Sequence, residues 1–228
     1  MPLDAQLDAL ARIYRVLDDT FDNSTLACHR GCAACCTQNV TMTTLEGYRI
    51  ITRLSQQANL REQLSAAADS SRFLPELTIN DLARQCAENG PVSEKNYPDD
   101  PAPCPLLADN ICTVYPVRPL ACRTMISTID CRKSGYAQMD SYFLSAGNIF
   151  LQFTEHIDQK GLTGNLTDVL SYVCDNRKRH HYEAGAAIAD VGGLLPNHPL
   201  TVLMVPPEHR QQVSPILNQL NPAIGKIG

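Results

Sequence analysis

Thiols dominate the chemistry that this sequence offers. The segment CHRGCAACC places Cys28, Cys32, Cys35 and Cys36 within a single short stretch. Thiolates bind zinc and iron–sulfur clusters, and the two-residue gap between Cys32 and Cys35 lets two thiolates reach one ion. Adjacent side chains diverge, so Cys35 and Cys36 do not easily share one tetrahedral ion. The doublet therefore predicts two metal centres, one multi-atom cluster, or a pair in which one thiol is not a ligand.

A second group of cysteines follows after a long gap in the sequence. It comprises Cys104, Cys112, Cys122 and Cys131. Folding must either bring the two groups together or let each stand alone. Cationic side chains, which stabilise thiolates, lie within or next to both groups: Arg30, Arg118, Arg123, Arg132 and Lys133.

Together the two segments resemble the cysteine-cluster (CxxCxxCC-type) family of zinc- or iron-chelating domains. The resemblance covers roughly Cys28 to Cys131 and departs from the usual pattern in the three-residue gap between Cys28 and Cys32. It implies metal chelation, and we take all eight cysteines of the two groups as candidate ligands. The matching elements are Cys35-Cys36, Cys104-Pro105, Cys112, Tyr115, Arg118-Pro119 and Cys122-Arg123.

Zinc and iron–sulfur clusters both accept four thiolates. The two are almost equally compatible with the sequence, and the all-cysteine donor set slightly favours iron–sulfur. Tyr115 and Arg118 lie between two candidate ligands and are expected around the metal, where they either shape the ligand loop or bond to sulfur. His29 is expected as a neighbour of the site or a surface residue.

The sequence is compatible with three functions. It contains no recognisable catalytic residue. The first is a metal-binding protein whose centre stabilises the fold. The second is a redox or protein-modifying enzyme, because the resemblance extends in part to flagellin lysine methylases, although no S-adenosylmethionine loop is recognisable. The third is a module that passes metal to a client protein. A disulfide scaffold is the remaining alternative, and an unidentified protein partner is compatible with each.

Composition restricts the setting and the partners. The net charge of -5 gives no general attraction to nucleic acid or to an anionic membrane. The first residues lack the basic start and apolar run of a signal peptide, and the apolar runs elsewhere are too short to span a bilayer. We therefore expect a cytoplasmic location with reduced thiols, and no nucleic-acid or membrane partner. The basic residues 177–181 fit the end of a helix.

The expected class is mainly α, a small helical domain with irregular cysteine-rich metal-binding loops. The expected divisions are a cysteine-cluster domain over residues 1–140 and a helical C-terminal extension over 141–228, packed on it. Thr43 and Glu46 have the spacing of a capping box, which predicts a helix start. Cys86 and Cys174 are expected to be small buried side chains. Apolar periodicity predicts helices near 3–17, 43–54, in pieces to 86, 142–157, 166–179 and 207–220, with a short strand at 201–207.

Overall fold

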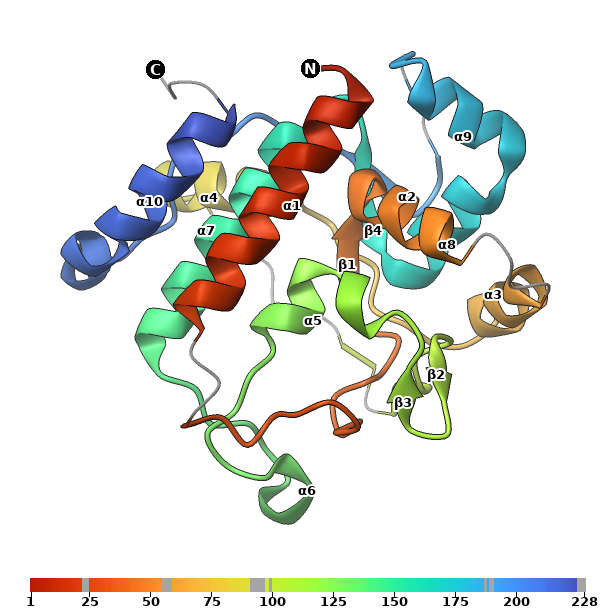
Figure 1. Cartoon of the computed structure of the whole chain (residues 1–228), viewed down its shortest axis with the longest axis horizontal. Coiled ribbons are helices and arrows are strands. Elements are labelled where there is room, and N and C mark those ends of the chain that lie inside the picture. The colour runs from red at the N-terminus through yellow and green to blue at the C-terminus, as the bar shows by residue number, and fades with distance from the viewer. Residues whose placement is uncertain are drawn as a thin grey trace.

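The structure, a computed structural model, describes residues 1–21, 25–54, 59–90, 97–98, 100–186, 188 and 191–224. Helices make up most of it, and the strands are short (Figure 1). The expected mainly α class is confirmed. None of the described helices has the length and apolar character needed to cross a membrane.

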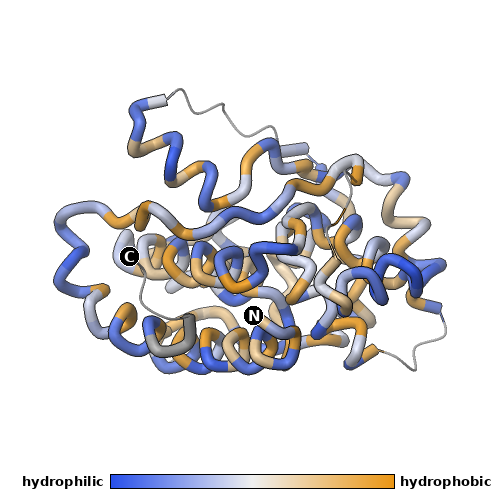
Figure 2. The backbone as a smooth tube through the Cα atoms, turned by 90° about the horizontal axis from the view of Figure 1, so that it is seen from above, coloured by the Kyte–Doolittle hydropathy of each residue, from blue (hydrophilic) through white to orange (hydrophobic). Residues whose placement is uncertain are grey.

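Three long helices enclose the first hydrophobic core. α1 (Leu3–Thr20) packs against α7 (Ser141–Ile157) and α10 (Arg210–Ile224), and all three run side by side in Figure 1. Apolar residues three or four positions apart turn one face of α1 inward, whereas α7 is buried on most sides between Ser145 and Ile157. Figure 2 shows hydrophobic and hydrophilic residues alternating along the helical turns of the tube. The most deeply buried side chains include Leu10, Ile13, Phe150 and Phe153.

A small antiparallel sheet supports the second core. Its order is β1 (Thr41–Thr43), β4 (Leu162–Asn165) and β5 (Leu194–Pro196). α2 (Thr44–Arg53), α3 (Leu60–Ala68) and α8 (Leu166–Cys174) pack together beside it. These strands were not predicted, because runs of three or four residues are too short to show the two-residue alternation of a strand.

The expected capping box is confirmed at the start of α2. The Thr43 hydroxyl accepts a hydrogen bond from the Glu46 amide, and the Glu46 carboxylate accepts one from the Thr43 amide. The same carboxylate accepts from the Tyr14 hydroxyl at 3.1 Å and from the Leu120 amide at 2.7 Å. Glu46 therefore ties α1 and α5 (Leu120–Thr124) to the sheet as well as capping its own helix.

Three sequence predictions about local structure were wrong. The helix predicted over 166–179 is two helices, because Asp175 accepts hydrogen bonds from the Arg177 and Lys178 amides and starts α9 (Asn176–Glu183). Residues 201–207 form no strand, and the nearby strand is β5. Cys86, on α4 (Ile79–Ala87), is exposed rather than buried.

The remaining expectations concern the termini and the middle of the chain. Cys174 is buried, as expected. The final helix begins after a short turn, η3 (Pro207–His209), and runs as α10 past the predicted end. Residues 88–105 contain no helix or strand in the part that the structure describes, and residues 91–96 and 99 of that segment lie outside the described residues. The expected division at residue 140 stays a prediction; β1 and β4 come from its two sides and pair with each other.

Candidate metal centre

The loop between α1 and β1 carries the first four cysteines. It folds through two tight turns, in which the Cys32 amide donates to the His29 carbonyl at 3.0 Å and the Cys36 amide to the Ala33 carbonyl at 3.1 Å. Gly31, at φ 91°, occupies the left-handed region that glycine adopts without strain. The turns bring successive thiols to one side of the loop without any helix.

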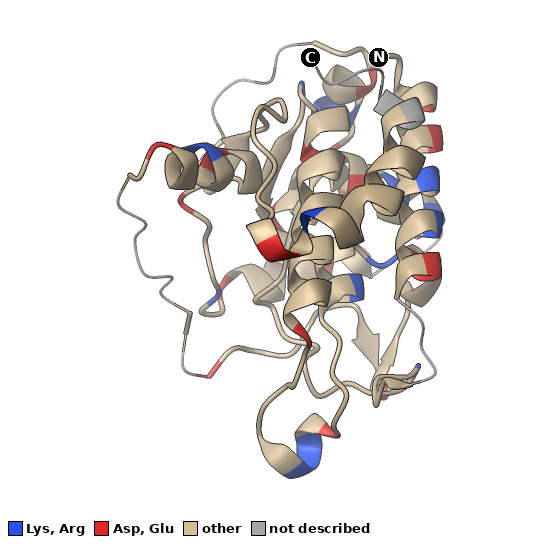
Figure 3. Cartoon of the chain, turned by 90° about the vertical axis from the view of Figure 1, so that its left-hand side faces the viewer, with Lys and Arg blue, Asp and Glu red and all other residues tan. Residues whose placement is uncertain are grey.

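The second group of cysteines lies on several short elements. Cys112 ends the hairpin of β2 (Leu107–Ala108) and β3 (Ile111–Cys112), whose turn holds Asp109 and Asn110 at φ 50° and 61°. Positive φ at both central residues is the geometry of a tight hairpin turn. A short turn, η2 (Tyr115–Val117), leads to Cys122 on α5, and Cys131 begins α6 (Cys131–Ser134). α6 projects from the lower end of the molecule in Figure 3.

Backbone pairing brings the two groups together. The Cys104 amide donates to the Cys36 carbonyl at 2.9 Å, and Thr37 forms an antiparallel bridge with Pro103. On the other side of the loop, the Ala27 amide donates to the Ser127 carbonyl at 2.8 Å. Two distant parts of the sequence are therefore held along the same loop.

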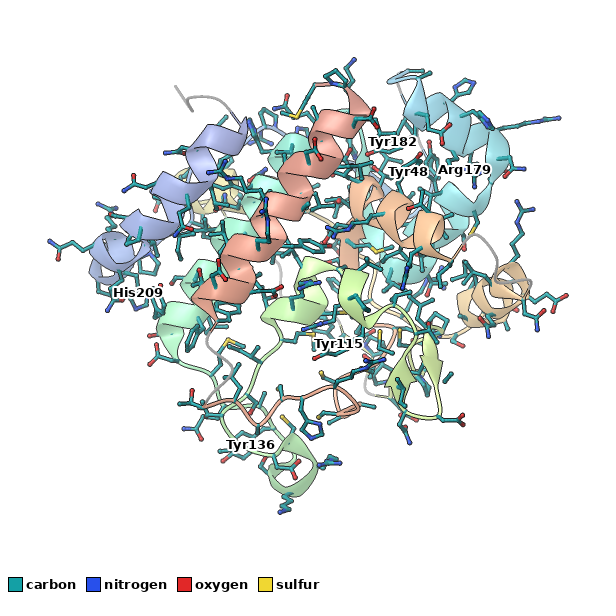
Figure 4. The ribbon with its side chains drawn as sticks, viewed as in Figure 1. Tyr48, Tyr115, Tyr136, Arg179, Tyr182 and His209 are labelled. Carbon is teal, nitrogen blue, oxygen red and sulfur yellow. The ribbon has the colours of Figure 1, made fainter. Side chains whose placement is uncertain are left out.

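Thiols from both groups line a single cavity of about 120 Å³. Figure 4 shows sulfur atoms near the labelled Tyr115, between the first loop, α5 and the β2–β3 hairpin. Leu17, Phe21, Val40 and Ile126 close parts of its wall with apolar side chains. The cysteines that line it are Cys28, Cys32, Cys35, Cys36, Cys104, Cys112 and Cys122.

Cys131 is the one candidate ligand outside the lining of this cavity. Its thiol lies 3.8 Å from the Ile129 carbonyl oxygen, and the Cys28 thiol lies 4.0 Å from the carbonyl oxygen of Ser127 in the same segment. Burial raises the pKa of Cys28, and the nearby charges of Cys35, Cys32 and Cys131 raise it further. Cys131 thus borders the cavity beside Cys28.

Burial makes the deepest thiols weak acids while no metal is bound. Burial raises the pKa of Cys104 to about 11, with a smaller effect from Cys112. Burial also raises the pKa of Cys122 far above its usual range, and repulsion from the thiolates of Cys104, Cys112 and Cys35 adds to it. At neutral pH these thiols hold their protons, so a metal ion must displace protons to bind here.

The doublet Cys35–Cys36 lies between two groups of cysteine sulfur atoms. A hydrogen bond from the Cys35 thiol to the Cys36 sulfur raises the pKa of Cys35 and lowers that of Cys36. The charges of Cys122, Cys104 and Cys112 partly offset this lowering of the Cys36 pKa. We call these three cysteines and Cys36 the inner group: Cys36, Cys104, Cys112 and Cys122. The charges of Cys35, Cys32 and Cys131 act on Cys28, and we call these four cysteines the outer group: Cys28, Cys32, Cys35 and Cys131. Cys35 borders both groups, because its charge also acts on Cys122.

The donor set fits a thiophilic metal, and the present arrangement is an open cavity. All ten cysteines are free thiols, and no disulfide competes for them. Within the described part of the chain, no three His, Cys, Asp or Glu side chains stand close enough together to hold one ion. The thiols surround a space instead of meeting at a point.

Tyr115 and Arg118 both line the cavity. The Arg118 guanidinium stacks 3.9 Å from the centre of the Tyr115 ring, and its Nη1 donates to the Tyr115 carbonyl at 3.0 Å. The positive charges of Arg118 and Arg30 oppose the effect of burial on the pKa of Cys112. His29 is exposed, with its Nδ1 2.9 Å from the Arg30 carbonyl oxygen, and stands at the edge of the cavity.

Arg123 has a positioning role that sequence reasoning missed. It is 6% exposed and donates to the carbonyls of Pro116 at 2.7 Å and Arg118 at 3.1 Å. Its Nη1 also binds the Asp18 carboxylate at 2.7 Å. Arg123 therefore fixes the η2 turn against α1, and the only signal for this in the sequence was a cation directly after Cys122.

Comparison with known proteins gives one match. The model of a family described as "CxxCxxCC: Putative zinc- or iron-chelating domain" matches residues 27–142, just over half of the chain. This interval contains all eight candidate cysteines, so the resemblance noted in the sequence is confirmed. No curated protein and no solved structure matches the chain.

Proposed function

We propose that this chain, which belongs to the CxxCxxCC family of zinc- or iron-chelating domains, binds metal in two four-cysteine centres at one cavity, whose lining includes every proposed ligand except Cys131. One observation carries the proposal: cysteines from the α1–β1 loop, the β2–β3 hairpin and α5 line the same space. These thiols line an open space instead of filling a core, which supports metal binding over packing alone.

The inner group forms the first centre in this proposal. Its four thiols come from three segments that the Cys104–Cys36 backbone bond and the hairpin hold in place. Each is partly shielded from water, which suits a permanent structural site. Metal bound here would tie the loop to the hairpin and α5, and would contribute directly to the free energy of folding.

The outer group forms the second centre. Cys35 is exposed, whereas the other three cysteines of this group are half-buried like those of the inner group. Cys131 enters from α6, where Arg132 and Lys133 supply positive charge next to the site. Dividing the doublet in this way assigns Cys35 and Cys36 to different centres, so the two adjacent thiolates need not share one tetrahedral ion.

For the metal, we favour iron–sulfur clusters, with zinc as the alternative. Four thiolates around one zinc ion lie about 3.8 Å apart, given a Zn–S distance of about 2.3 Å and tetrahedral geometry. A cluster of several atoms accepts a wider ring of sulfurs, and a cavity of about 120 Å³ lined by thiols suits that width. The ten free thiols also support the cytoplasmic location that we propose.

Positive charge near the cavity supports thiolate ligation. Four thiolates around one zinc ion leave a net charge of -2, and the arginines that line or border the cavity offset part of it. Arg118 stands beside the inner group through its effect on Cys112 and Cys122. Its ring contact with Tyr115 holds this guanidinium in place, and Arg123 holds the Arg118 backbone through a hydrogen bond to its carbonyl.

Metal content of single-cysteine variants tests the proposal. Cys36→Ser should lose the metal of the inner centre and Cys35→Ser that of the outer centre, so each retains about half of the wild-type metal. Cys86→Ser is the matched control, because Cys86 is exposed on α4, outside the cavity lining. If both doublet variants, like the control, keep the full complement, the assignment is wrong.

The same samples separate two further functions. A visible absorption band that bleaches with dithionite supports a redox or protein-modifying role for the centre. Rapid transfer of metal to a competing chelator, from the outer centre first, supports metal handling. A colourless protein with slow exchange supports a purely structural centre.

A further inference from the structure

A second cavity, separate from the cysteines, lies between β1, α7 and the segment that leads into α4. Its volume is about 220 Å³, and it shares no lining residue with the cysteine cavity. Its walls are largely apolar, with side chains from four parts of the chain: Met42, Phe73, Leu77, Ile79, Leu82 and Leu151. Ligand sites are typically concave and mostly apolar with a few polar groups.

The polar groups of this cavity are acidic or neutral. Glu46, Glu76 and Glu155 line it, and none of the described residues that line it is Lys, Arg or His. Glu155 is 1% exposed, and its carboxylate accepts from the amides of Asn80 at 2.8 Å and His198 at 2.7 Å. The cavity therefore repels anions and stabilises a cation placed beside these carboxylates.

Thr154 provides an unused hydrogen-bonding group in the same wall. It is 1% exposed on α7, and its hydroxyl has no hydrogen-bond partner among the described residues. A buried hydroxyl without a partner costs about 1–3 kcal/mol, so such groups usually have a bound ligand or water. Thr154 and Glu155 are neighbours in sequence and both face the cavity.

The entrance and size of the cavity restrict what enters. Leu74 and Leu77, both lining residues, are 49% and 37% exposed, so the approach from solvent is apolar. A volume of about 220 Å³ is below the range of about 300–1,000 Å³ for drug-sized ligands. These features fit a small ligand with a hydrocarbon part.

We propose that this cavity binds a small organic amine. The ammonium group lies between the Thr154 hydroxyl and the Glu155 carboxylate, and donates to both. The hydrocarbon part lies against the leucines of α4 and α7. The proposal is independent of the metal centres, because the two cavities have separate walls.

Calorimetric titration of the full-length, metal-loaded protein with n-hexylamine tests this proposal, with n-hexanol and hexanoate as ligands of similar length. We expect hexylamine to bind at least tenfold more tightly than either, since charge and hydrogen bonding both favour it. Thr154→Val, which removes the hydroxyl and keeps the shape, should weaken hexylamine binding about tenfold. The free energy of unfolding of Thr154→Val should be unchanged or slightly higher than that of the wild type, because no internal hydrogen bond is lost.

Thr167→Val is the matched control. The Thr167 hydroxyl on α8 is also buried and without a partner among the described residues, but Thr167 lines neither cavity. It should leave hexylamine affinity unchanged. Three outcomes would overturn the proposal: no hexylamine binding, which leaves water only in the cavity; equal affinity for hexylamine and hexanol; or equal losses in the two threonine variants.

Discussion

Replacing Asp158 by asparagine tests how the buried Asp158 carboxylate, at the end of α7, joins that helix to α2 and α9. Asp158 is fully buried at the end of α7. Its Oδ2 accepts from the Thr44 hydroxyl at 2.7 Å, the Leu45 amide at 3.0 Å and the Asn197 side chain at 3.1 Å. Its Oδ1 accepts from the Tyr182 hydroxyl at 2.7 Å. An asparagine oxygen can replace Oδ2, so we expect Asp158→Asn to fold.

The magnitude follows from the pKa of this group. Burial, and then the charge of Glu46, raise the pKa of Asp158 from 3.8 to about 7, although its hydrogen bonds act the other way. The native state then holds a proton that the unfolded chain has already released. The stabilisation is fully present below about pH 4 and is lost as pH rises through about 7. At about 1.4 kcal/mol per pKa unit, the loss amounts to about 4 kcal/mol at most.

Asp158→Asn cannot titrate, so its free energy of unfolding relative to wild type should rise by up to about 4 kcal/mol between pH 4 and pH 8. Urea denaturation of both proteins at several pH values measures this difference, and pH effects at the shared cysteines cancel in it. Asp175→Asn is the control, since hydrogen bonds from the Lys178 and Arg177 amides lower the pKa of exposed Asp175. The contribution of the Asp175 carboxylate to the free energy of unfolding is lost only as pH falls below about 4. Parallel curves for wild type and Asp158→Asn would refute the reasoning.

Four further predictions concern stability and metal affinity. Gly161→Ala should lower the free energy of unfolding by about 2–4 kcal/mol, because the added Cβ would overlap both carboxylate oxygens of Asp158. Gly192→Ala is the control and should leave the free energy of unfolding unchanged, because the space around Gly192 is open. Urea denaturation compares the two variants. Thr43→Ala should cost about 1 kcal/mol by removing the cap of α2, and unchanged stability would contradict that role. Removing metal with a chelator under reducing conditions should lower the melting temperature. Because burial raises the thiol pKa values, metal affinity should fall as pH falls, and a pH-independent affinity would contradict proton displacement.

The sequence predicted what depends on local spacing. α1 and α7 follow from apolar residues three and four positions apart, and the start of α2 follows from the capping pair Thr43 and Glu46. The cysteine pattern predicted the family but left open whether the two groups of cysteines would meet; seven of the eight candidates line one cavity. The signals for the helices and the cap lie within a few residues, where the geometry of the chain is nearly fixed, whereas the cysteine pattern spans two distant segments.

The rest depends on contacts between distant residues. The short strands have too few residues for a periodic signal, and β1 exists because it pairs with β4 across more than a hundred residues. The break at Asp175 shows that one capping side chain can override a continuous helical pattern. Arg123 acquires its role only when the Asp18 carboxylate and the η2 carbonyls come together in space. The second cavity has no motif at all, because its walls come from separated segments.

Metal, sulfide and thiol content per chain after anaerobic purification tests most directly whether the cysteine cavity holds inorganic centres. Two four-thiolate centres predict about two zinc ions per chain, or several iron atoms matched by an equal amount of acid-labile sulfide. Most of the ten thiols should then be unreactive until the metal is removed. A purified protein with almost no metal and ten freely reactive thiols would contradict both centres.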